Sequence, residues 1–259
     1  QQSDGLSLKG TYTGFEQFEL VSITSMSDTD HRHAYDGDWA NPEYWQDKAC
    51  VDYYDENGNG ATDDIIGCTY DYLWDKRAER TSYSQEIRLS SNDAGRIFND
   101  STHWLAGIYV SKLDEENDLD SSYNGWPDEV LDSEYQAKNT AIFGQLDSEL
   151  GQGYQLSAGL RFERRSTDYD DSQGDEFSPS ENMWGGHLAL SKQLSETHGA
   201  YARIAKGYKA GGFNMGLPAE LSRYKEFDTE TLLNYELGLK SQFSELRSEE
   251  HTSELQSPV

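Results

Sequence analysis

Alternation of apolar and polar residues is the feature of this sequence that most constrains its fold. In the run YQLSAGLRFE at 154–163, every even position is apolar and the odd positions are polar or glycine. A period of two residues is typical of a β-strand with one apolar face. The same period recurs at 6–12, 83–89, 184–190 and 233–239, and no helical period is sustained. The sequence therefore predicts an all-β protein.

The alternating runs predict about nine strands that form an antiparallel up-and-down meander. We place them near 6–14, 17–27, 80–92, 102–113, 134–149, 153–168, 183–193, 200–210 and 228–243. Short connections are expected near 15, 92–101, 149–153 and 194–199, and long loops at 28–79, 114–134, 168–182 and 211–227. Every second connection of a meander lies on the same side, so all the long loops share one end. This arrangement is typical of a transmembrane β-barrel.

The acidic residues are concentrated in the predicted long loops. The 259 residues include 48 Asp and Glu against 21 Lys and Arg, a net charge of −27. More than half of the acids fall within 28–79, 114–134 and 168–181. The net charge argues against nucleic acid or anionic lipid headgroups as partners. The 17 Tyr, 9 Phe and 6 Trp argue against a disordered chain.

Charged and aromatic residues inside the predicted strands fit a membrane wall. We expect the charged ones to face the lumen, because a lipid-facing charge at mid-bilayer costs about 2–4 kcal/mol. These are Arg88, Arg161, Glu163, Lys192, Arg203 and Lys206. Aromatics near the strand ends predict interfacial girdles, although aromatics also favour strands in general. The girdle residues expected are Tyr12, Tyr83, Trp104, Tyr109, Phe162, Tyr169, Trp184, Tyr201 and Tyr208.

Two segments resemble the barrel of the TonB-dependent outer-membrane receptors. They are YARIAKGYKAGGFN at 201–214 and FDTETLLNYELGLKS at 227–241, supported by SQEIRLS, WLAGIY, AIFGQ and AGLRF in the family's order. The resemblance spans roughly residues 80 to 243. Its motif residues are Gly207, Tyr208, Lys209, Gly211, Gly212, Phe213, Asn214, Asn234, Tyr235, Glu236, Gly238 and Lys240.

The resemblance implies a location in the outer membrane of a Gram-negative bacterium, in contact with its lipid. It also implies active uptake of a scarce small ligand, such as an iron–siderophore complex, powered by the TonB system through a plug domain. Such barrels have 22 strands, so residues 1–246 are expected to be part of a barrel. Residues 247–259 resemble a translated adapter and are excluded as a non-native tail.

The motif residues carry further expectations from the resemblance. The glycines are expected to permit a bulge or tight turn at the barrel rim. Tyr208 and Tyr235 are expected at the membrane interface, and Lys240 or Glu236 in the lumen. The alternative for each motif residue is a role in barrel assembly instead of transport.

The segment between the two cysteines begins like a calcium-binding loop. Asp55, Asn57 and Asn59 match the first ligand positions and Asp63 a later one, but Ile66 occupies the place of the bidentate Glu. An EF-hand is therefore not expected. A looser calcium site is one hypothesis, with calcium as the only cofactor considered, and an acidic hairpin tip is the other.

Cys50 and Cys68 are the only cysteines of the chain. Their spacing fits one disulfide that closes a surface loop in an oxidising compartment, and two free thiols are the alternative. A loop of this size closed by a disulfide gains about 3 kcal/mol in the chain-entropy model.

Ligand capture is expected in the long loops. The first loop is rich in aromatic residues suited to stacking on a ligand, or alternatively to packing on one another. These are Trp39, Tyr44, Trp45, Tyr53, Tyr54, Tyr70, Tyr72 and Trp74. His31 and His33 are two apart, so an extended chain places them on one face, where they could bind one ligand as metal-binding pairs do. Solvated loop residues without such a role are the alternative.

Two other functions compete with the receptor hypothesis. A secreted, calcium-stabilised β-sandwich that binds carbohydrate through its aromatics is one, and a passive porin is the other. No Ser-His-Asp order and no Cys-His pair suggests catalysis, so we do not expect an enzyme.

Overall fold

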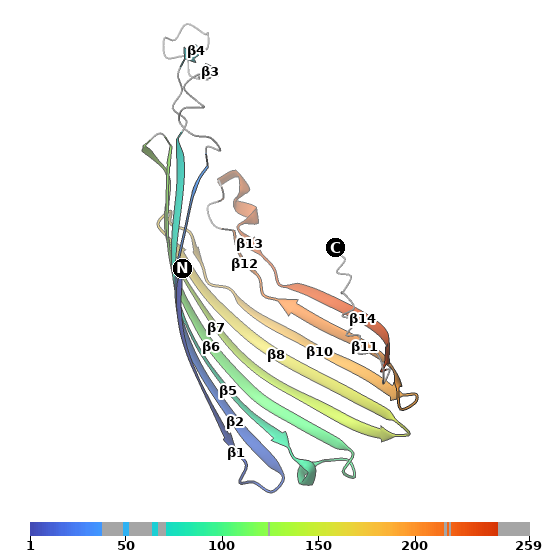
Figure 1. The fold of residues 1–259 in the computed structure, drawn as a ribbon. Helices are drawn as coiled ribbons and strands as arrows, with labels where there is room; N and C mark the ends of the chain where they lie inside the picture. Colours follow the sequence, from blue (N-terminus) through green and yellow to red (C-terminus); the bar gives the residue numbers. More distant parts are fainter. Residues whose placement is uncertain are drawn as a thin grey trace.

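The computed structural model describes residues 1–37, 49–51, 64–66, 71–123, 125–214, 217 and 219–242. Its main feature is one curved, open sheet of long antiparallel strands in sequence order (Figure 1). The nine long strands are β1 (Gln2–Tyr12), β2 (Phe18–Asp36), β5 (Tyr72–Ser91), β6 (Thr102–Tyr123), β7 (Trp126–Gly151), β8 (Tyr154–Asp171), β10 (Ser180–Gln193), β11 (His198–Lys209) and β14 (Glu230–Ser241). The predicted fold class and the nine strands are confirmed.

Smaller elements decorate the sheet. Strand β9 (Glu176–Phe177) pairs with β8, while β12 (Gly212–Phe213) with β13 (Glu226–Phe227), and β3 (Ala49–Val51) with β4 (Asp64–Ile66), form separate hairpins. Two 3-10 turns, Asp93–Gly95 and Ala219–Tyr224, lie in connections. Strands β1 and β14 form the two edges of the main sheet. No helix in the described part of the chain is long and apolar enough to cross a membrane.

The predicted loop at 114–134 is wrong. Strands β6 and β7 continue through it, and only residues 124 and 125 separate them. Cross-strand pairs stabilise such polar extensions: Arg80 pairs with Glu115 on the inward face. Alternation ends where both faces of the sheet become polar, but the backbone hydrogen bonds continue. For the same reason β2, β5 and β8 extend into the predicted loops 28–79 and 168–182.

The two faces of the sheet differ in chemistry. Directly paired residues of antiparallel strands share a face, and one such row crosses β5, β6, β7, β8 and β10 with large, exposed, apolar side chains. The row is Ile87, Ile108, Ile142, Phe162 and Trp184. We name this the outward face, since a transmembrane barrel turns its apolar band to lipid.

The opposite, inward face carries polar and buried side chains. Its neighbouring row is Glu86, Tyr109, Ala141, Glu163 and Met183. The buried apolar side chains of the described residues all belong to this face, namely Val21, Leu131, Ala137, Ala141, Tyr169 and Met183. The inward face is therefore the packed and polar side of the wall.

The register corrects several predicted orientations. Tyr12, Tyr83, Trp104, Phe162 and Trp184 lie on the outward face as a girdle requires. Four other expected girdle residues instead lie on or reach the inward face, namely Tyr109, Tyr169, Tyr201 and Tyr208.

The predicted lumen charges are corrected in the same way. Four of them face inward as predicted, namely Arg88, Arg161, Glu163 and Arg203. Lys192 and Lys206 face outward, against the prediction. Both lie at the ends of the apolar band, where a long side chain reaches the polar interface at little cost.

Candidate functional site

An ion pair lies on the inward face at the middle of the sheet. The Nη2 of Arg161 lies 2.7 Å from Oε2 of Glu163, and the hydroxyl of Tyr208 donates to the same oxygen at 2.9 Å. Arg161 also donates to Tyr208 at 3.2 Å and lies 5.3 Å from the ring centroid of Tyr109. All three polar groups are satisfied by one another, so this network rigidifies the wall.

Tyr208 leaves the regular alternation of β11. Pairing of β11 with β10 ends at Lys206, which faces outward. Two residues on, the Tyr208 ring contacts the inward Arg161 and Glu163. This explains why Tyr208, expected at the membrane interface, lies with the lumen charges.

Four aromatic rings gather on the inward face of β2 and β5, at the end with the longest connection. Tyr35 and Trp74 stack at 5.1 Å between centroids, His33 lies 5.8 Å from Trp74, and His31 lies 6.4 Å from His33. We name this set the outer aromatic patch. The two histidines share a face, as their spacing predicts, but they belong to strand β2 and not to a loop.

A hollow of about 290 Å³ lies beside the patch on β5, β6 and β7. Asn117 lines it with only 4% of its surface exposed, and its Oδ1 accepts no hydrogen bond from the described residues. The amide of Asn117 donates to Oε1 of Glu115 at 3.0 Å. The other lining residues are Trp74, Lys76, Leu119, Glu129, Leu131 and Ser133. A buried, unpaired acceptor in a hollow of mixed polar and apolar lining is suited to a ligand that donates a hydrogen bond.

Much of the segment predicted as a long loop at 168–182 is packed against an aromatic cluster. We name the cluster of Tyr169, Phe177 and Phe213 the aromatic rim. Tyr169 is 4% exposed, and its ring centroid lies 5.6 Å from that of Phe213 and 6.0 Å from that of Phe177. Burial raises the pKa of the Tyr169 hydroxyl, which donates to Asp171 at 2.8 Å. An ion pair between Lys225 and Asp175 joins the next connection to the same rim.

The first motif segment holds this rim together. A Cβ on Gly211 would meet the carbonyl oxygen of Phe227 at 2.4 Å, and one on Gly212 would meet the Phe227 ring at 2.7 Å. The Nδ2 of Asn214 donates to the carbonyl of Tyr224 at 2.8 Å. These contacts favour the assembly role for this part of the motif.

The remaining motif residues lie on β11 and β14. Tyr201 donates to Oε1 of Glu236 at 2.5 Å, its ring lies 5.3 Å from the Nζ of Lys240, and Gly238 leaves space for that ring. Glu236 and Lys240 thus face inward as expected. Asn234 shares their face, Tyr235 is outward and 71% exposed, Gly207 has open space beside it, and Lys209 lies 4.0 Å from Glu230.

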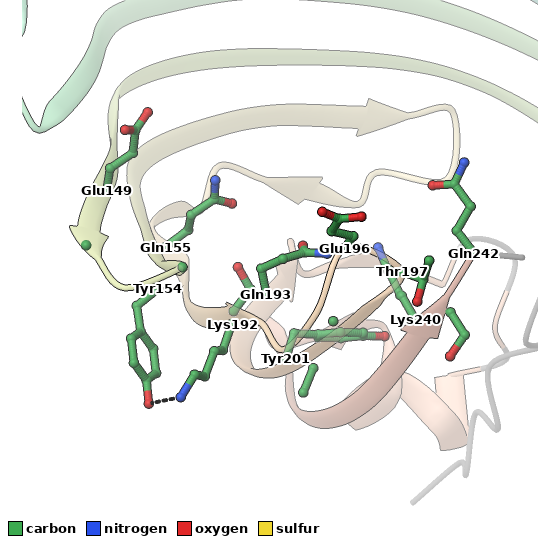
Figure 2. Close-up of a pocket in the computed structure, with 16 residues that line it drawn as sticks. Glu149, Tyr154, Gln155, Lys192, Gln193, Glu196, Thr197, Tyr201, Lys240 and Gln242 are labelled. Atoms are coloured by element: carbon green, nitrogen blue, oxygen red, sulfur yellow. Dashed lines mark hydrogen bonds between the residues drawn. The ribbon is translucent and has the colours of Figure 1, made fainter. Parts of the chain in front are cut away.

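A second hollow, of about 650 Å³, lies at the short-turn end of the sheet (Figure 2). The turn after β7, the turn after β10 and the end of β14 form it. Lys192 donates to the hydroxyl of Tyr154 at 2.9 Å at one side (Figure 2). Glu149, Glu196 and Lys240 also line it, so this end offers a polar surface of mixed charge.

Several predicted site residues fall outside the described residues. They are the aromatics Trp39, Tyr44, Trp45, Tyr53, Tyr54 and Tyr70, the calcium candidates Asp55, Asn57, Asn59 and Asp63, and Cys68 together with the side chain of Cys50. The calcium site and the disulfide stay predictions. Tyr72 and Trp74 begin strand β5, and Trp74 belongs to the outer aromatic patch.

A sequence model of the family described as "TonB dependent receptor-like, beta-barrel" matches residues 1–249. The chain belongs to this family. Receptors of this family lie in the outer membrane of Gram-negative bacteria, and the chain therefore lies there too. Its outward face is the one that contacts lipid. The family match covers the strands whose register is described above.

Relatives and solved structures agree with this assignment. The pesticin receptor of Yersinia enterocolitica is 29% identical over 165 residues, covering 60% of this chain and 24% of that receptor. The pesticin receptor of Yersinia pestis is 31% identical over 111 residues, covering 40% of this chain and 16% of that receptor. The chain therefore spans a quarter or less of the length of these receptors.

Two solved structures show the same fold. The ferric yersiniabactin uptake receptor FyuA from Yersinia pestis superimposes with a TM-score of 0.66 at 20% identity, covering 93% of this chain and 33% of that one. The siderophore receptor PiuA from Acinetobacter baumannii superimposes with a TM-score of 0.65 at 11% identity, covering 93% and 38%.

Proposed function

We propose that this chain forms part of the wall of a receptor that actively takes up an iron–siderophore complex, driven by the TonB system through a plug domain. The observation that carries the proposal is the family match over residues 1–249, combined with the outer aromatic patch on the inward face. Two of the similar solved structures, titled a ferric yersiniabactin uptake receptor and a siderophore receptor, support the choice of ligand. The family is one of transport receptors, so the role proposed for the chain is in transport.

The outer aromatic patch is suited to the first contact with such a ligand. Tyr35 and Trp74 present stacked rings, and rings of this kind add about 0.5–1.5 kcal/mol per aromatic contact beyond area burial. The neighbouring hollow adds the cation of Lys76 and the unpaired Oδ1 of Asn117. A planar, polar-edged chelate finds both stacking and hydrogen-bonding partners there.

The described strands argue against the β-sandwich alternative. A sandwich packs two sheets face to face, whereas the long strands form one sheet whose apolar row is exposed. A passive porin would have the same kind of barrel wall. Dependence of uptake on the proton-motive force therefore distinguishes the receptor from a porin.

The test uses uptake of radioactive iron by cells that carry the receptor containing this chain, with ferric yersiniabactin as the first probe. Replacing both Tyr35 and Trp74 with Ala is expected to raise the half-saturating concentration about tenfold, because two stacking contacts are lost. Tyr83→Ala, on the outward face of β5, is the matched control and should leave it unchanged. Uptake that persists after the proton-motive force is collapsed would favour the porin.

A further inference from the structure

The hollow beside Asn117 is built on three neighbouring strands of the inward face. Its floor is the directly paired Leu119 of β6 and Leu131 of β7, and Lys76 of β5 is opposite Leu119 in the same row. Asn117 lies one inward position from this row on the side toward the membrane, and Glu129 lies one inward position from it on the other side. The hollow therefore has an apolar floor and three polar edges, each supplied by a different strand.

The side-chain amide of Asn117 has a fixed orientation. Its Nδ2 donates to Oε1 of Glu115 at 3.0 Å, and a carboxylate only accepts hydrogen bonds. The atom without a partner among the described residues is therefore Oδ1. Because Asn117 is 4% exposed and an unpaired buried acceptor is costly, this edge of the hollow is suited to a hydrogen-bond donor from a ligand.

Lys76 and Asn117 are diagonal neighbours across β5 and β6. Diagonal positions are about 7–8 Å apart, and both side chains line the same hollow. Two groups attached to one carbon atom of a ligand, an anion and a donor, can therefore bind to Lys76 and Asn117 together.

Opposite charges stand on the two sides of the floor. Neither the ammonium of Lys76 nor the carboxylate of Glu129 forms a hydrogen bond or ion pair with the described residues. The next inward charges toward the membrane, Arg80 and Glu115, already pair with each other. Strands β5 and β7 are two strand spacings apart, about 10 Å. Lys76 and Glu129 are therefore suited to opposite charges of a ligand that are separated by an apolar chain lying on the floor.

The size of the hollow limits what it can hold. A volume of about 290 Å³ lies at the small end of the range for ligand pockets, about 300–1,000 Å³. The hollow thus accommodates one unit of a larger ligand. Trp74 lines the hollow and also stacks on Tyr35. A ligand that contacts the outer aromatic patch can therefore reach the hollow with an attached arm.

We propose that the hollow binds a basic amino-acid unit of the ligand, which carries a carboxylate and an ammonium on one carbon and a cation at the end of a short apolar chain. The carboxylate bonds to Lys76, the adjacent ammonium donates to Oδ1 of Asn117, and the terminal cation pairs with Glu129. Charge-assisted hydrogen bonds of this kind are roughly twice as strong as neutral ones. The proposal rests on the proposed function, because the unit belongs to the complex that the receptor takes up.

The experiment measures binding of free L-lysine, the simplest such unit, to the purified receptor containing this chain by equilibrium dialysis. Three further probes each lack one group. L-norleucine lacks the terminal cation, ε-aminocaproate lacks the ammonium beside the carboxylate, and cadaverine lacks the carboxylate. Each is expected to bind about tenfold more weakly than L-lysine, because one charge-assisted hydrogen bond is lost.

Substitutions assign each group to its partner. Glu129→Gln is expected to weaken binding of L-lysine about tenfold and to leave L-norleucine unchanged. Lys76→Gln should weaken L-lysine equally and leave cadaverine unchanged, and Asn117→Ala should leave ε-aminocaproate unchanged. The matched controls are Glu134→Gln and Lys138→Gln, which remove the same charges from exposed positions on the outward face of β7 and should not affect L-lysine.

Two results would overturn the proposal. One is L-lysine that binds no more tightly than the three truncated probes, and the other is a control variant that loses as much affinity as Lys76→Gln. If Asn117→Ala fails to fold, the Lys76 and Glu129 variants still decide. Iron uptake is not the readout, so failure here leaves the proposed function standing. Uptake that is insensitive to loss of the outer aromatic patch, with L-lysine binding intact, would contradict the proposed function alone.

Discussion

The inward and outward faces of the same strands give residues one position apart quite different surroundings. On β8, Phe162 is exposed within an apolar row, while Arg161 and Glu163 on either side of it form an ion pair to which the Tyr208 hydroxyl hydrogen-bonds. Whether a residue occupies an odd or an even position along the strand therefore decides which face its side chain lies on and what it contacts. A substitution is expected to act through lipid exposure on one face and through lost polar partners on the other.

The largest contrast is expected for a charge placed on each face of β8. Leu160→Arg exposes a cation to lipid near the middle of the band and is expected to cost about 2–4 kcal/mol. Ser157→Arg enters a hollow on the inward face that Asp147 also lines, and should cost less than 1 kcal/mol. Urea titration of the receptor folded in lipid bilayers measures both, and equal losses would contradict the assignment of faces.

A smaller effect is expected from alanine substitution of two motif glycines, Gly211 between β11 and β12 and Gly207 within β11. Gly211→Ala places a Cβ 2.4 Å from the Phe227 carbonyl oxygen, whereas Gly207 has nothing within 4 Å. Overpacking of this kind costs about 1–3 kcal/mol. Hydrogen exchange at the Asn214 amide, which donates to the carbonyl of Lys225, should accelerate about tenfold or more only in the Gly211 variant. Acceleration in both variants would point to the strand instead of the contact.

The smallest contrast compares two tyrosines of the motif. Tyr208→Phe removes the hydroxyl that joins Arg161 and Glu163, at an expected cost of about 1 kcal/mol. The outward Tyr235 has no hydrogen bond among the described residues, so Tyr235→Phe should change the midpoint in urea by little. A larger loss at Tyr235 would reverse the comparison.

Sequence reasoning identified the strands whose pattern of apolar and polar residues is complete within one segment of the chain. The apolar positions of 154–163 and 184–190 predicted strands with one lipid face, and both are observed. It predicted that β6 ends near residue 113, because Asp and Glu occupy both faces of the strand beyond that point. Apolar and polar residues no longer alternate there, so the strand cannot be recognised from its period. The hollow beside Asn117 was missed for that reason, since it lies in the extension that was predicted to be a loop.

The sequence by itself determined the strand period, the family and the lipid-facing composition, because these depend on neighbours along one chain. Only the tertiary structure decided which partners meet. The pairing of Lys112 with Lys138, the turn of Tyr208 toward Glu163 and the stacking of Tyr35 on Trp74 all join different strands. Cross-strand register sets such contacts, and a shift of one residue would send each side chain to the other face.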